Sequence, residues 1–173
     1  TSKKIGGLVP MNVLLASIAE EAARVLRVEA SGFRLVEGDH PDPAGATEAA
    51  REAMRAQRPR QSESLSGWVL THGRPLAVAD VGEDPRLIED HRQAARRLGH
   101  RAFLGVPLRV GERVIGALNF RAQGARQFTE EDERLATAFA DQAAIAIENA
   151  RLYEAAERAA ARLKTLNALS QVV

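Results

Sequence analysis

Arginine is the side chain whose clustering in this sequence could do chemistry. Five arginines gather within one short stretch: Arg86, Arg92, Arg96, Arg97 and Arg101. Guanidinium groups bind phosphate and carboxylate in a forked geometry, so the cluster is a candidate anion site. The alternative is a solvated helix face, on which Glu89 and Asp90 offset part of the charge. We favour the solvated face.

The other reactive side chains do not form a catalytic pattern. The histidines are His40, His72, His91 and His100, and none has metal-ligand spacing with another. Ser62, Ser64 and Ser66 lie in a polar loop without an obvious base nearby, which favours capping and solvation over nucleophilic catalysis. The sequence has no phosphate-binding loop, nucleophile elbow or HExxH motif. We therefore expect a module that is not an enzyme.

Composition further narrows the classes of protein to which this chain could belong. The chain has 173 residues, 45% of them hydrophobic and 27% charged, with a net charge of +1. It has no cysteine, which removes disulfides, thiolate nucleophiles and cysteine metal sites. No segment reads as a signal peptide, and none approaches the roughly twenty apolar residues of a membrane span. The basic cluster is confined to one short stretch and aromatic residues are few, which argues against nucleic acid as a binding partner. We expect a cytoplasmic domain without membrane contact.

The stretch from Phe103 to Phe120 predicts a β-hairpin. Its turn centres on Gly111-Glu112, and glycine in first place suggests a type II′ turn. Simple pairing then places on one face the pairs Leu104–Asn119, Val106–Ala117 and Leu108–Ile115. The other face receives Phe103, Gly105 and Pro107 with Phe120, Leu118 and Gly116. Because both faces are largely apolar, we expect packed structure on each side.

A long helix follows the hairpin. Thr129 is its expected N-cap, and Asp132 completes a variant capping box. Its alanine-rich first half predicts burial on more than one side. From Ile145 apolar residues recur at seven-residue steps, a pattern typical of a coiled-coil seam. The seam comprises Ile145, Leu152, Ala159, Leu166 and Val173, with a second column of Asn149, Ala156, Leu163 and Ser170. The alternative is a lone helix that folds back on its own domain.

The sequence before the hairpin predicts several short helices and strands. We expect helices over Pro10 to Leu26, Ala46 to Gln57, Gly67 to His72, and from Pro85, capped by Asp84, to Gly99. Strands are expected over Ala30 to Glu37 and Leu76 to Ala79, and residues 38–45 read as a loop.

The hairpin and long helix together resemble a GAF domain. The matching residues are Val106, Pro107, Leu108, Gly116, Leu118, Phe128, Thr129, Asp132, Ala146, Glu148, Asn149, Ala150, Arg151 and Leu152. GAF domains are sensory modules of histidine kinases, cyclic-nucleotide phosphodiesterases and diguanylate cyclases. The resemblance implies an α+β fold with an antiparallel sheet of about five strands. Terminal helices would cover one face, while middle helices and loops would form a ligand cleft on the other.

The resemblance also divides the chain and constrains the ligand. It implies a linker over residues 1–9, the GAF domain over 10–153, and a signalling helix over 154–173 that leads to a following domain. The chain departs from the family where a helix at 46–57 stands in place of a second strand. Phe120 occupies the lysine position of the cyclic-nucleotide pattern otherwise offered by Asn119, Phe128, Asp132 and Glu133, so that ligand is not supported. A bilin is not supported either, because no cysteine could anchor it.

These inferences give two groups of candidate residues. The expected ligand-binding residues are Trp68, Asp80, His91, Phe103 and Gly105, with the ligand unidentified. Asn119 joins them only if a bulge shifts the hairpin pairing. The expected interface of a parallel homodimer is Ile145, Leu152, Leu163 and Leu166, with the first helix beside it. The predicted function is a sensory module that transmits ligand binding through these helices. The alternative is a structural dimerisation spacer with a filled pocket. A methionine sulfoxide reductase is a remote third, because it needs the missing cysteines.

Overall fold

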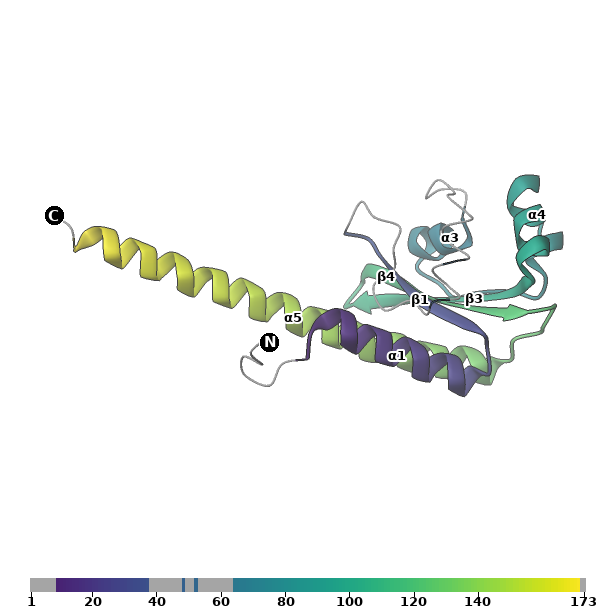
Figure 1. Cartoon of the computed structure of the whole chain (residues 1–173), viewed down its shortest axis with the longest axis horizontal. Helices are drawn as coiled ribbons and strands as arrows, with labels where there is room; N and C mark the ends of the chain where they lie inside the picture. The colour runs from purple at the N-terminus through teal and green to yellow at the C-terminus, as the bar shows by residue number, and fades with distance from the viewer. Residues whose placement is uncertain (1–8, 38–47, 49–51, 53–63, 172–173) are drawn as a thin grey trace.

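The computed structural model describes residues 9–37, 48, 52 and 64–171. Two layers of helices enclose one sheet (Figure 1). The elements are α1 (Met11–Leu26), β1 (Ala30–Leu35), α3 (Leu65–His72), β2 (Leu76–Val78), the 3-10 helix η2 (Val81–Glu83), α4 (Glu89–Leu98), β3 (His100–Val110), β4 (Arg113–Gln123) and α5 (Glu130–Ser170). Most of the helix predicted at 46–57, the loop at 38–45, His40, Ser62 and nearly all of the predicted linker lie outside the described residues.

The sheet is antiparallel, with the strand order β1-β4-β3-β2. The sequence predicted about five strands, and the described residues contain four. The predicted departure from the family falls between β1 and α3. There Glu48 and Glu52, the two described residues of that segment, are both helical.

The turn of the central hairpin is confirmed. Val110 pairs with Arg113, which leaves Gly111 and Glu112 as the two turn residues. Gly111 has φ of 61°, whereas Glu112 is not among the described residues with positive φ. A positive φ at the first turn position alone is the signature of the predicted type II′ turn.

The predicted pairing of the hairpin is wrong by one residue. A bulge between Leu108 and Arg109 shifts the register, so that Leu104 pairs with Phe120 and Gly105 with Asn119. The extra residue cannot be read from a two-residue turn, because simple pairing assumes equal residue numbers on both strands. A slip of one residue moves each side chain to the opposite face. Asn119 consequently shares a face with Phe103 and Gly105.

One face of the sheet packs against α1 and α5, and we call it the terminal-helix face (Figure 1). Its core is apolar and includes Phe33, Leu104, Leu118 and Phe120, each fully buried. Small residues of α5 allow close approach: Ala136, Ala140, Ala143 and Ala144. These alanines form one stripe of α5, and Arg134, Ala138 and Ile145 on the opposite side are exposed, so the predicted burial on more than one side is wrong.

The predicted start of α5 is also confirmed. The Asp132 amide donates to Thr129 Oγ1 at 3.1 Å, and the Thr129 amide donates to the Asp132 carboxylate at 2.9 Å. The start predicted for α4 is wrong. This helix begins at Glu89 with Ile88 as N-cap, because Asp84 accepts the Arg86 amide at 2.8 Å and holds a turn instead. Gly99 ends α4 with φ of 73°, as predicted.

Beyond the sheet α5 continues alone (Figure 1). Every residue from Leu152 to Gln171 is exposed. The hydrophobic side chains on this part include Leu152, Leu163, Leu166 and Leu169, each exposed by 56% or more.

Candidate functional site

The face of the sheet opposite α1 and α5 lies beneath α3 and α4, and we call it the α3 face (Figure 1). Alternate strand residues define it through the observed register. They are Ala30, Gly32 and Arg34 of β1; Ala117, Asn119 and Arg121 of β4; Phe103, Gly105 and Pro107 of β3; and Leu76 and Val78 of β2.

The half of this face over β2 and β3 is filled by apolar side chains. Phe103 and Val69 are buried there, and Trp68 packs against the same cluster. A methyl group placed on Gly105 would lie 2.9 Å from the Phe103 ring and 2.9 Å from Val69 Cγ2. Glycine at this position therefore lets Phe103 and Val69 close over the strand.

The half of the face over β1 and β4 carries polar side chains. Asn119 is only 8% exposed, and its Nδ2 donates to Ser66 Oγ of α3 at 3.2 Å. Its Oδ1 is buried without a hydrogen-bond partner. A buried amide oxygen without a donor is costly, by about 1–3 kcal/mol. Asn119 thus presents an unused acceptor on this face.

Two arginines flank Asn119 on the same face. Arg34 Nη1 donates to Ser64 Oγ at 2.7 Å, and burial lowers the pKa of its guanidinium. Arg121 makes no hydrogen bond or ion pair with any residue in the described ranges. Its side chain is partly exposed, yet enough protein surrounds the guanidinium that burial lowers its pKa too. Both cations are therefore partly desolvated, and neither forms an ion pair with a carboxylate of the described ranges.

His100 lies at the start of β3, near the end of β4. Its Nδ1 is buried without a hydrogen-bond partner. Burial lowers the pKa of the imidazole, and the positive charge of Arg121 lowers it further, while Glu29 and Glu52 act in the opposite direction. The ring therefore favours its neutral form.

The structure brings some of the predicted ligand residues together and separates others. Phe103 and Gly105 are side by side on the α3 face, with Trp68 at the edge of their cluster. The Trp68 ring also stacks on His72, with centroids 4.1 Å apart. Their role in ligand binding stays a prediction.

Asp80 and His91 occupy different surroundings. Asp80 caps η2 by accepting the Gly82 amide at 3.0 Å, and it forms an ion pair with Arg101. His91 is a half-buried residue of α4, and its backbone amide donates to the Ile88 carbonyl at 3.1 Å. A ligand role for either residue also stays a prediction.

Four of the five arginines in the cluster on the α4 side have carboxylate partners, and the fifth, Arg97, is exposed. Arg86 pairs with Asp84, which lowers the pKa of that carboxyl through its side-chain hydrogen bond. The further pairs are Arg92 with Glu89 at 2.8 Å, Arg96 with Glu83 and with Glu89, each at 3.1 Å, and Arg101 with Asp80. These arginines bridge η2, α4 and β3, which agrees with the favoured reading of a solvated, internally compensated surface.

Neither Arg34 nor Arg121 was predicted from the sequence as a site residue. Arg121 was assigned to a polar connection after the hairpin, but β4 runs on to Gln123. The available signal was the alternation of Ala117, Asn119 and Arg121, which share one face once the strand is extended. Arg34 alternates with buried Phe33 in the same way.

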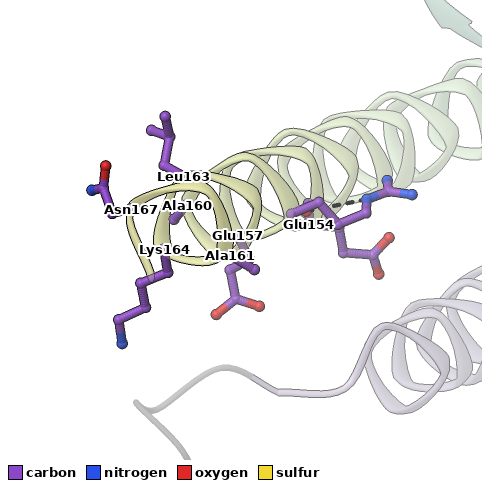
Figure 2. A pocket seen from close by; sticks show the side chains of 8 residues that line it. Glu154, Glu157, Ala160, Ala161, Leu163, Lys164 and Asn167 are labelled. Atoms are coloured by element: carbon purple, nitrogen blue, oxygen red, sulfur yellow. Dashed lines mark hydrogen bonds between the residues drawn. The ribbon is translucent and has the colours of Figure 1, made fainter. Parts of the chain in front are cut away.

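An open groove runs along the projecting part of α5 (Figure 2). Its lining residues are Glu154, Glu157, Arg158, Ala160, Ala161, Leu163, Lys164 and Asn167. All of them are exposed and belong to one helix, so the groove lacks the enclosing walls of a ligand site.

No group of three or more His, Asp or Glu side chains in the described ranges could hold a metal ion. No helix within them combines the length and apolarity that a membrane crossing requires.

Comparison with known proteins identifies the family. The GAF domain model matches residues 10–147, and the chain therefore belongs to the GAF family, whose members are sensory and regulatory modules of signalling proteins. A GAF domain of a phosphoenolpyruvate-protein phosphotransferase from Coxiella burnetii superposes with a TM-score of 0.70 at 21% identity, covering 89% of this chain and 92% of that one. A domain of a putative two-component sensor histidine kinase protein from Sinorhizobium meliloti gives a TM-score of 0.69 at 16% identity, covering 87% and 99%.

One similar structure is an enzyme. The free methionine-R-sulfoxide reductase from Neisseria meningitidis, solved with its substrate, has a TM-score of 0.64 at 22% identity and covers 85% of this chain and 83% of that one. At this identity the likeness establishes the shared fold alone. GAF domains themselves are generally not catalytic.

Proposed function

We propose that this chain is a sensory module that binds a small molecule on its α3 face and transmits binding through α5. The observation that carries the proposal is the buried Oδ1 of Asn119, which lacks a donor. Natural domains rarely leave such a group unsatisfied, and a ligand donor would satisfy it. On α5, which packs against the opposite face, Glu148 Oε2 is also buried without a hydrogen bond, but it lies 3.8 Å from Arg113 Nη2, which balances its charge.

β4 provides a physical route between the two faces. Asn119 points to the α3 face, while its neighbours Leu118 and Phe120 are fully buried in the core shared with α1 and α5. A ligand that shifts β4 would therefore shift the surface on which α5 rests. The ligand biases the assembly only if it binds two arrangements of α5 with unequal affinity.

The proposed output is a parallel homodimer through α5, with α1 beside it. Ile145 is 64% exposed, Leu152 60%, Leu163 63% and Leu166 56%, and pairing two chains would bury them. Burial of apolar area contributes about 25 cal/mol per Å². Parallel pairing would bring two downstream output domains together, such as the kinase or cyclase domains with which GAF modules occur.

A ligand screen tests the sensory part. The wild-type chain is heated with members of a metabolite library, and Asn119→Leu is heated in parallel. We expect at least one compound to raise the Tm of the wild type and to lose that effect in the variant. Ser17→Leu, an exposed site on α1, is the control that should keep it. A library without any such compound would contradict the proposal.

Sedimentation tests the dimer. We expect the wild type to sediment as a dimer at micromolar concentration, and Leu152→Glu with Leu166→Glu to sediment as a folded monomer. Ala161→Glu with Ala168→Glu adds the same charge to exposed sites outside the heptad columns and should remain dimeric. A wild type that is monomeric at high micromolar concentration would refute the interface.

The second candidate function is a dimerisation spacer without a ligand. The buried position of Phe103 and Val69 over Gly105 favours it, because those side chains fill the β3 half of the face. It predicts the same dimer and a negative ligand screen.

A further inference from the structure

The cations of the α3 face, above all Arg121, define the chemistry of the ligand, and this inference rests on the function proposed above. We propose that the α3 face binds a small molecule with a carboxylate or phosphate group, held by Arg121, and with an N–H or O–H donor that reaches Asn119 Oδ1. Arg34 stands at the far side of Asn119 as a second cation.

Charge balance is the first argument. Arg86, Arg92, Arg96 and Arg101, on the α4 side, each have a carboxylate partner. Arg121, on the α3 face, has no partner in the described ranges although protein surrounds it. A guanidinium taken out of water without a counter-charge is destabilising, and a bound anion would offset that desolvation. Its forked donors suit carboxylate and phosphate alike.

Position is the second argument. Arg121 pairs with Ala30 and Asn119 with Gly32, so β1 carries at most a methyl group beside these polar side chains. Arg34 pairs with Ala117, four positions along the strand from Arg121, or roughly 13 Å between Cα atoms. The two arginines thus lie about the length of a small molecule apart, and between them β1 contributes only the small residues Ala30 and Gly32. Asn119 lies between the two arginines with one acceptor unused.

The experiment uses inorganic phosphate and acetate as probes, each against sodium chloride at equal ionic strength. We expect one of them to raise the Tm of the wild-type chain by about 3–6 °C at ten times its Kd. The stronger probe indicates whether phosphate or carboxylate is the natural group. Arg121→Gln should abolish the shift. Arg134→Gln, whose side chain is 74% exposed on α5, is the matched control and should keep it.

A second measurement separates ligand binding from a structural role. Without added anion, Arg121→Gln should keep or raise the Tm, because it removes an unpaired cation; a marked fall would mean an internal partner and overturn the proposal. The Arg121 Nε–Hε resonance should move in the wild type on titration with the active probe, and no movement with either probe would also overturn it. If the metabolite screen instead finds a neutral ligand that Asn119→Leu abolishes, the sensory function stands and the anion proposal fails.

Discussion

The two faces of the sheet carry alternate side chains of the same strands, yet they bury different chemistry. On the terminal-helix face Leu118 and Phe120 pack against α1 and the alanines of α5. On the α3 face Asn119 and Arg121, from the same strand, retain polar groups without partners in the described ranges. The terminal-helix face buries mainly apolar side chains that pack closely. The α3 face buries polar groups at a cost in stability that a bound ligand could offset. Unsatisfied polar groups cluster at functional sites for this reason.

The largest expected effect comes from placing an amide side chain on the terminal-helix face. Leu118→Asn should lower the free energy of unfolding by roughly 3–5 kcal/mol, because it removes a buried side chain and leaves an amide without partners. Urea denaturation followed by circular dichroism measures the change. A loss below about 1 kcal/mol would show that this face is not a closed core.

Gly116 tests how tightly β1 and β4 approach each other. A Cβ there would lie 2.6 Å from the Arg34 carbonyl oxygen and 3.0 Å from Leu35 Cδ2. Simple pairing of the sequence places Gly116 opposite Pro107, but Gly116 pairs with Leu108, and the obstacle to a side chain is the backbone of β1. Gly116→Leu should cost roughly 1–3 kcal/mol.

The control for this substitution is Ala77→Leu, an exposed position on the edge strand β2. It should leave the Tm nearly unchanged. Equal melting temperatures for the two variants would mean that the close approach of β1 and β4 is wrong.

The pH dependence of stability tests whether His100 is buried and uncharged in the folded chain. Its folded-state pKa is lowered from the ordinary value of 6.5, chiefly by burial. Below that value the unfolded chain binds a proton that the folded chain does not, so His100 costs stability as pH falls from about 7 toward the folded pKa. His100→Gln should lose less stability than the wild type between pH 7 and 5.5, by urea denaturation at each pH. Parallel pH profiles would refute an uncharged, buried imidazole.

Asn119 should give the smallest effect. Asn119→Leu loses the hydrogen bond to Ser66 but also removes the unpartnered Oδ1, and the two terms oppose each other. We expect a change in the free energy of unfolding below about 1 kcal/mol, from the same urea measurement as for Leu118→Asn. A loss as large as that of its neighbour would mean that Asn119 is a structural residue.

The sequence by itself determined the local elements. Helical periodicity placed α1 to within a residue, the Thr129 and Asp132 pair gave the start of α5, and Gly111 set the hairpin turn. Each of these follows from interactions between residues a few positions apart, which a sequence displays directly. Asp84 misled the prediction for α4 because the same side chain can hold a turn or cap a helix.

Only the tertiary structure decided the contents of each face. The bulge beside Leu108 moved Asn119 to the α3 face, and a strand has period two, so one inserted residue reverses all the side chains beyond it. Which arginines gain carboxylates was likewise settled in space. Glu83 reaches Arg96 and Asp80 reaches Arg101 from other segments, while Arg121 receives no carboxylate in the described ranges. Charge pairing depends on distances between segments that the order of residues does not contain.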